Sequence, residues 1–203
     1  MNKIILHGTI RNIRPSHEVH GVAYSKAEFV VQRADSKADV LDIRFNNKCK
    51  IPAEGEQMDI VGNIRSHSAE QPDGHKRSEI YVYTKFELPS GEATGNNQFD
   101  VTGKICKKDD ERTTVSGKKN TRFVIASNIP VGDSKRISAY LPCVAWGSVS
   151  KKMKDFSITD SIHITGELHS REYKKTLENG DVEIRLAREL VVHTVESVAE
   201  DAV

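Results

Sequence analysis

The chain contains one pattern twice, first as Ile4-Ile5-Leu6-His7-Gly8-Thr9-Ile10 and again as Phe99-Asp100-Val101-Thr102-Gly103-Lys104-Ile105. In both stretches every second residue is apolar or glycine, which is typical of a strand with one buried face. Later segments repeat in the same order: the alternation of residues 58–64 returns at 162–168, and that of residues 80–86 returns at 184–190. The chain therefore has two similar halves, each predicted to hold about five short strands.

The halves are separated by a segment of linker composition. Residues 89–97 contain proline, glycine, serine and asparagine and almost no apolar groups to bury, so we expect a linker there. Residues 1–88 then form a first domain and residues 98–196 a second, followed by a short acidic C-terminus at 197–203. Each domain is long enough to fold around a modest core.

The second half carries an insertion that predicts a short helix. Val149, Met153 and Phe156 have the spacing of one helical face, and Ser148 stands before them as an N-cap. Five strands with a helix between the third and fourth is the order of the OB-fold, a small closed Greek-key barrel. We therefore expect an all-β protein of two tandem OB-fold barrels, the first without the helix. The periodicity alone also fits other five-stranded barrels, such as SH3-like ones.

Composition limits the classes of partner. Lys and Arg total 30 against 29 Asp and Glu, a net charge of +1, so bulk charge cannot hold a nucleic acid. No stretch approaches the about 18 apolar residues of a membrane span, and the first residues do not resemble a signal peptide. Three widely spaced cysteines, Cys49, Cys106 and Cys143, argue against a disulfide framework or a zinc module. We expect a cytoplasmic protein without membrane contacts.

The sequence also lacks the signatures of common enzymes. It has no phosphate-binding loop and no dinucleotide-binding glycine motif after a strand. His163 and His169 share a strand face but stand about 20 Å apart, too far to ligate one ion. Cys143 has the pattern of a small buried residue rather than a nucleophile. We predict no enzymatic activity, no cofactor or metal, and no small-molecule substrate.

The third strand of the second half places large rings on its outer face. Alternation directs Leu141, Cys143 and Ala145 inward, which leaves Tyr140, Val144 and Trp146 outward. The outer surface of strands two and three is the oligonucleotide platform of OB-folds, and a base stacked on an aromatic ring is worth about 1–3 kcal/mol. In the alternative interpretation, Trp146 packs under the helix that follows.

Positive charges surround this platform in the sequence. In the fourth strand Arg171 and Tyr173 point outward beside His169, and Tyr173 opens a hairpin with an Asn-Gly turn at 179–180. The predicted nucleic-acid contacts from this hairpin and from the loop between the first two strands are Arg171, Tyr173, Lys174, Lys175, Lys107, Lys118, Lys119 and Arg122. A solvated hairpin and loop with incidental charge are the alternatives.

The first half lacks this equipment. Its third strand directs Leu41, Ile43 and Phe45 inward, and Val40 and Asn46 take the places of Tyr140 and Trp146. Arg44 and Arg65 can still contact phosphates, and Tyr81 and Tyr83 can form an interface or a weaker binding track. We infer that the second domain holds the nucleic acid and the first supports it.

These segments resemble the bacterial single-stranded DNA-binding protein family over nearly all of residues 98–196. The run Tyr140-Leu141-Pro142-Cys143-Val144-Ala145-Trp146-Gly147 is similar to that family's third-strand motif. The run Gly166-Glu167-Leu168-His169-Ser170-Arg171-Glu172-Tyr173 is similar to its Gly-x-Leu-x-(Thr/Ser)-Arg-x-aromatic segment. The resemblance implies that Tyr140, Trp146 and Tyr173 stack on bases of single-stranded DNA, in the cytoplasm at the nucleoid, during replication, recombination or repair. The first half resembles the family only in its strand pattern and in residues 62–66.

The chain departs from the family in two places. It has no aromatic residue after the second strand, and residues 196–203 lack the tail whose acidic tip recruits replication and repair proteins in that family. Replication proteins therefore stay open as partners, but not by that route. Two OB domains in one chain resemble family members that assemble four OB-folds from a homodimer, so we expect a homodimer. An RNA-binding or primosomal OB-fold protein, acting through RNA or protein contacts, is the alternative function.

Overall fold

The computed structural model describes residues 1–70, 76–86, 97–131, 135–176 and 180–198. Strands dominate these residues. The first half contains β1 (Asn2–Val19), β2 (Val22–Gln32), β3 (Ala38–Asn46), β4 (Gln57–Glu70) and β5 (Lys76–Thr84). The second half contains β6 (Gln98–Lys108), β7 (Arg112–Thr113), β8 (Lys119–Val131), β9 (Lys135–Trp146), α1 (Gly147–Lys152), the 3₁₀ turn η1 (Met153–Asp155), β10 (Ser161–Thr176) and β11 (Val182–Ser197).

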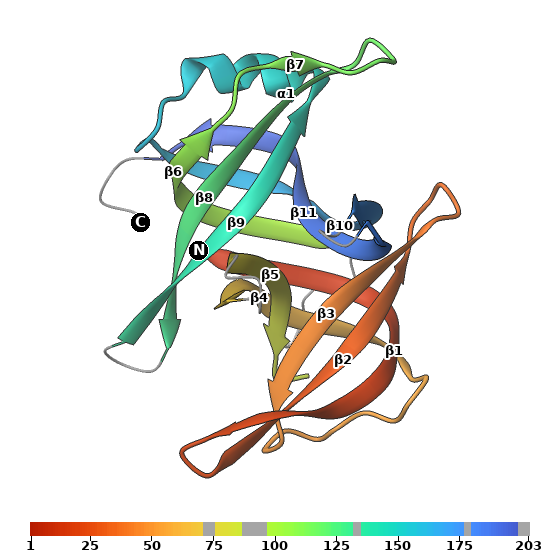
Figure 1. Ribbon diagram of the computed structural model, residues 1–203. Coiled ribbons are helices and arrows are strands. Elements are labelled where there is room, and N and C mark those ends of the chain that lie inside the picture. Colours follow the sequence, from red (N-terminus) through yellow and green to blue (C-terminus); the bar gives the residue numbers. More distant parts are fainter. Residues whose placement is uncertain (71–75, 87–96, 132–134, 177–179, 199–203) are drawn as a thin grey trace.

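Each half closes into a five-stranded barrel (Figure 1). In the first half β1 pairs with β2 and β4, β2 pairs with β3, β4 pairs with β5, and a parallel pairing of β3 with β5 closes the ring. The second half repeats this ring with β6, β8, β9, β11 and β10, and its closing parallel pair is β9 and β11. The repeated order confirms the predicted tandem OB-fold architecture. Among the described residues, only the second barrel carries a helix between its third and fourth main strands.

The two barrels join through their first strands. Residues 2–5 of β1 pair antiparallel with β6, which makes one continuous sheet across the molecule (Figure 1). Matching hydrogen bonds stand on either side of this pair: the backbone N–H of Tyr140 donates to Ser66 Oγ and that of Val40 donates to Ser170 Oγ, both at 2.8 Å. The halves therefore contact each other through equivalent residues, as an approximate two-fold relation between them requires.

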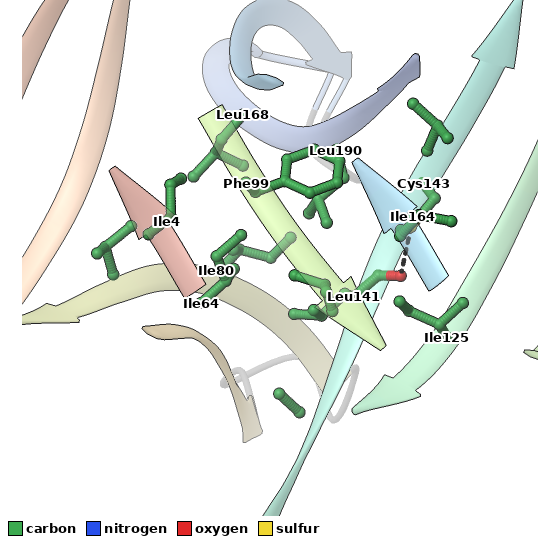
Figure 2. Packing of buried hydrophobic residues seen from close by; sticks show 14 of the residues in the cluster. Ile4, Ile64, Ile80, Phe99, Ile125, Leu141, Cys143, Ile164, Leu168 and Leu190 are labelled. Carbon is green, nitrogen blue, oxygen red and sulfur yellow. Dashed lines mark hydrogen bonds between the residues drawn. The ribbon is translucent and has the colours of Figure 1, made fainter. Parts of the chain in front are cut away.

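An apolar core runs through both barrels (Figure 2). The inward positions predicted from alternation are fully or almost fully buried in both halves: Ile4, Leu6, Leu41, Ile43, Phe45, Phe99, Val101, Leu141, Cys143, Ala145, Ile162, Ile164 and Leu168. The residues between them form the outer surface of the barrels, because successive side chains of a strand point to opposite faces. Any binding side chains on these strands must come from that outer set.

The helix differs from its prediction at the N-terminus. It begins at Gly147, with Trp146 at the N-cap position and no side-chain cap, so the assignment of Ser148 as N-cap was wrong. Ser150 is instead buried and its hydroxyl lies 2.8 Å from that of Thr121. The predicted inward face is confirmed, since Met153 and Phe156 are buried and Val149 packs on the core.

The loop and hairpin around the second barrel are shorter than predicted. Lys107 and Lys108 belong to β6 rather than to the loop after it, and Lys119 already begins β8. Tyr173 lies within β10, which continues to Thr176. The predicted Asn-Gly turn includes residue 179, which lies outside the described residues.

Gly166 allows β10 to cross β11 at close range. A Cβ built on Gly166 would lie 2.0 Å from the carbonyl oxygen of Val191 and 2.9 Å from Cζ of Phe99. The pairing of β10 with β11 shifts register next to this glycine. A glycine is therefore required here for barrel closure, as predicted from its repeated position in the fourth strand.

We predict that Gly166→Ala lowers the free energy of unfolding by more than Gly21→Ala, measured by denaturant titration. Gly21 has φ +73° and nothing within 4 Å of its Cβ position, so its substitution costs only backbone strain of about 1–2 kcal/mol. Gly166→Ala must also displace a backbone carbonyl in a packed barrel. Equal stability of the Gly166→Ala variant and the unsubstituted chain would contradict this account of barrel closure.

Candidate nucleic-acid interface

The outer face of β9 presents two aromatic rings at its two halves. Tyr140 is 53% exposed and Trp146 is 38% exposed. Val144, predicted on the same outer face, is fully buried, so that prediction was wrong. Its neighbours in register, Arg122 of β8 and Val191 of β11, flank it on both sides. Trp146 stands at the end of β9, where this cover ceases.

A hollow of about 860 Å³ lies beside Trp146. Trp146 and Val191 give it apolar walls, and three lysines stand around it, from the loop before β8, the start of β8 and α1. Its lining comprises Gly117, Lys118, Lys119, Trp146, Gly147, Ser148, Lys151, His169 and Val191. More than a third of Trp146 is exposed, so α1 does not cover the ring. An apolar floor with an ammonium rim suits a flat base attached to a phosphate.

One carboxylate positions two of the predicted arginines. Glu189 of β11 is 16% exposed and lies 3.4 Å from Arg122 Nη1 and 3.4 Å from Arg171 Nε. The two guanidinium groups remain 44% and 48% exposed. Two cations on one anion leave a local positive charge next to the hollow. Sequence reasoning missed Glu189, although the inward position of Leu190 places its neighbours Glu189 and Val191 on the outer face.

The remaining predicted cations are dispersed. Lys118 lies beside Trp146, and Lys119 is held by Glu111 at 3.0 Å. This hydrogen bond from Lys119 lowers the pKa of Glu111. Lys107 and Lys174 are exposed and Lys175 is half-buried on their strands, and none of the three lines the hollow. Lys108 is structural, because its ammonium donates to the carbonyls of Met153 and Phe156.

The aromatic residues do not form one cluster. Tyr140 and Trp146 stand at positions about 20 Å apart along β9, and the backbone of Tyr140 is held by Ser66 of the first barrel. Tyr173 is half-buried on β10, with the Arg171 guanidinium 5.9 Å from its ring. The structure therefore groups Trp146 with Lys118 and Lys119, and Arg122 with Arg171. It leaves Tyr140 as a separate exposed ring.

In the first barrel the predicted arginines have partners within the chain. The Arg44 guanidinium lies 4.0 Å from the Tyr81 ring centre and pairs with Asp42 and Glu79. Arg65 lies 3.9 Å from the ring of Tyr83. Burial raises the pKa of Tyr83, whose hydroxyl accepts a hydrogen bond from Asn46. One face of each tyrosine is thus covered by a guanidinium group, and Arg44 is only 15% exposed.

Other chemistry has little support in the described part of the chain. No group of three His, Cys, Asp or Glu side chains there can hold a metal ion. His163 and His169 are bonded to separate carboxylates, Asp100 and Glu167. Complete burial raises the pKa of the Cys143 thiol well above its ordinary value. Among the described residues there is also no helix with the length and apolar character of a membrane span.

Comparison with known proteins places this geometry in context. The model of the Single-strand binding protein family matches residues 96–198, about half of the chain. The wild-type single-stranded DNA binding protein from Thermus aquaticus has a similar structure, with 17% identity, a TM-score of 0.73, and coverage of 98% of this chain and 94% of that one. A deletion mutant of that protein gives 16% identity and a TM-score of 0.71, covering 99% of this chain and 96% of that one. At this identity the likeness concerns the fold. The sequence matches none of the curated proteins with which it was compared.

Proposed function

This chain belongs to the single-strand binding protein family and binds single-stranded DNA, and we propose that it does so by stacking bases on the outer face of its second barrel. The carrying observation is Trp146, an exposed ring in a hollow rimmed by Lys118, Lys119 and Lys151. The ring receives a base, and the ammonium groups neutralise the phosphates on either side. Tyr140 and Tyr173 supply further stacking positions, with Arg122, Arg171, Lys107, Lys174 and Lys175 beside the strand.

Stacking explains both tolerance of sequence and preference for single strands. Every base has a π-face, so a tryptophan ring accepts any of the four at about 1–3 kcal/mol each. In a duplex those faces are already stacked on neighbouring base pairs and are closed to a protein ring. Because the chain has a net charge of only +1, phosphate attraction adds less than it does for a strongly basic protein.

The biological setting follows from this binding mode. A protein that covers unpaired bases without reading them protects single strands that are exposed during replication, recombination or repair. We place it in the cytoplasm at the nucleoid, acting as a binding protein rather than as an enzyme. The buried thiol of Cys143 and the separately paired histidines support that reading.

We predict that Trp146→Ala weakens binding to oligo-dT by about 5- to 150-fold, the equivalent of 1–3 kcal/mol. The loss should exceed that of Lys118→Ala, because the lysine supplies one screened phosphate contact. In the unsubstituted chain, titration with oligo-dT should quench the fluorescence of Trp146, the chain's one tryptophan.

The matched control is Tyr24→Ala, which removes an aromatic ring stacked on His17 in the first barrel. It should leave oligo-dT binding unchanged. Competition with poly-U and duplex DNA completes the test, with poly-dT expected to compete best. Equal affinity for duplex DNA, or a Trp146→Ala variant that binds like the unsubstituted chain, would contradict the proposal. Preference for poly-U would favour an RNA-binding function instead.

We also propose that two chains associate into a homodimer with four OB-folds. The strands β5, β4, β1, β6, β10 and β11 are consecutive in one sheet that spans both barrels. Its outer-facing residues include Ile5, Val61 and Thr165, which are only partly exposed. A broad, continuous sheet face of this kind supplies the self-complementary surface that a two-fold dimer uses.

Light scattering at micromolar protein should therefore give twice the chain mass of 22.7 kDa. An Ile5→Glu substitution at the centre of the sheet face should reduce this toward one chain mass while circular dichroism stays unchanged. A monomer mass for the unsubstituted chain at that concentration would remove the homodimer proposal.

A further inference from the structure

A second hollow, of about 630 Å³, lies between the two barrels. Arg33, Lys37 and Val40 of the first barrel form one side, and Trp146, His169 and Arg171 of the second barrel line the other. Trp146, His169 and Val191 also line the hollow beside the platform. The two hollows are therefore parts of one groove that passes Trp146 and runs onto the first barrel.

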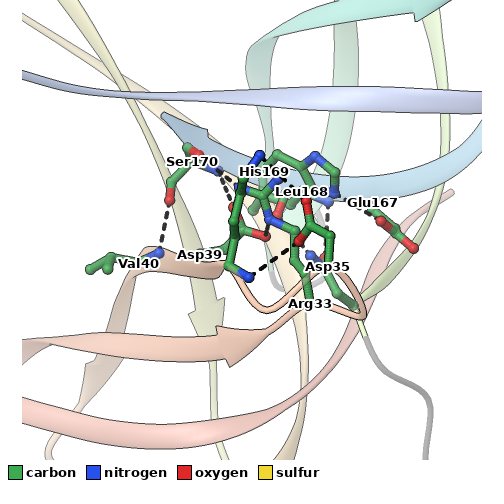
Figure 3. Close-up of polar contacts among 10 residues, drawn as sticks. Arg33, Asp35, Asp39, Val40, Glu167, Leu168, His169 and Ser170 are labelled. Atoms are coloured by element: carbon green, nitrogen blue, oxygen red, sulfur yellow. Dashed lines mark hydrogen bonds and ion pairs between the residues drawn. The ribbon is translucent and has the colours of Figure 1, made fainter. Parts of the chain in front are cut away.

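The first-barrel wall of this groove is fixed against the second barrel (Figure 3). The Asp39 carboxylate is fully buried, pairs with Arg33 at 2.8 Å and accepts the backbone N–H of Ser170. Arg33 Nη2 donates to the Ser170 carbonyl at 3.2 Å, and Arg188 Nε donates to the Val40 carbonyl at 3.0 Å. A wall held by buried hydrogen bonds need not be ordered when a ligand arrives.

The wall also presents a cation. The side chain of Lys37 is 71% exposed, and its ion-pair partner, Asp35, lies 3.5 Å away with 53% of its own side chain exposed. Such a surface pair contributes little stability, so a phosphate can displace the carboxylate from the ammonium at small cost. Val40 adds a half-buried apolar surface next to Trp146 in the same groove.

We propose that the DNA strand bound at Trp146 continues through this groove, with a phosphate at Lys37 and a sugar or base against Val40. This inference rests on the proposed function and extends its site. It assigns to the first barrel a direct contact with the strand, where the sequence indicated only a supporting role. The occupant is the same single strand, because the groove is continuous with the Trp146 hollow and offers both a cation and apolar surface.

The test compares short and long oligo-dT on the intact chain, with Trp146 fluorescence as the readout. OB-folds cover about 4–16 nucleotides each, so oligomers of about 5 and about 20 nucleotides separate the Trp146 hollow from the extended groove. Lys37→Glu should weaken binding of the long oligomer by about tenfold and leave the short one unchanged. Lys37→Ala should reduce the salt slope for the long oligomer by about 1.

The matched control is Lys50→Glu, which makes the same change in net charge at an exposed position of the first barrel and lines neither part of the groove. It should bind both oligomers like the unsubstituted chain. If Lys37→Glu and Lys50→Glu behave alike at both lengths while Trp146 is still quenched, the extended groove is overturned and the proposed function stands. If oligo-dT does not quench Trp146 in the unsubstituted chain, the proposed function fails first.

Discussion

The backbone pairing of β1 with β6 determines where every outer face of this molecule lies. It joins two closed barrels into one sheet, and the bonds from Tyr140 to Ser66 and from Val40 to Ser170 hold the barrels on both sides of it. The third strand of each barrel is thereby brought against the fourth strand of the other. A groove lined by both barrels, with Trp146 in it, is a consequence of this arrangement.

Alternation at period two located the strands and their buried residues because each barrel strand has one face in the core. It could not foresee the burial of Val144, which depends on neighbours in register, Arg122 and Val191, that are distant in the chain. Nor could it foresee that Arg44 lies over Tyr81. The N-cap at Ser148 failed because the helix begins one residue earlier, directly from the end of β9. Contacts between distant strands supplied what the local pattern lacked.

Charge around the candidate site is balanced rather than simply positive. Glu111 holds Lys119, Glu189 holds Arg122 and Arg171, and Asp35 lies near Lys37. Each carboxylate orients its cations and weakens their long-range field. With phosphate attraction limited in this way, the exposed ring of Trp146 becomes the feature that distinguishes a single strand from other polyanions.

Binding of an abasic oligomer tests this claim most directly, because such a strand keeps every phosphate and removes every base. Fluorescence titration should compare it with oligo-dT of the same length at one salt concentration. If bases stacked on the second barrel hold the strand, the abasic oligomer should bind at least about tenfold more weakly and leave Trp146 unquenched. Equal affinity for the two oligomers would show that the phosphates hold the strand and would contradict the account.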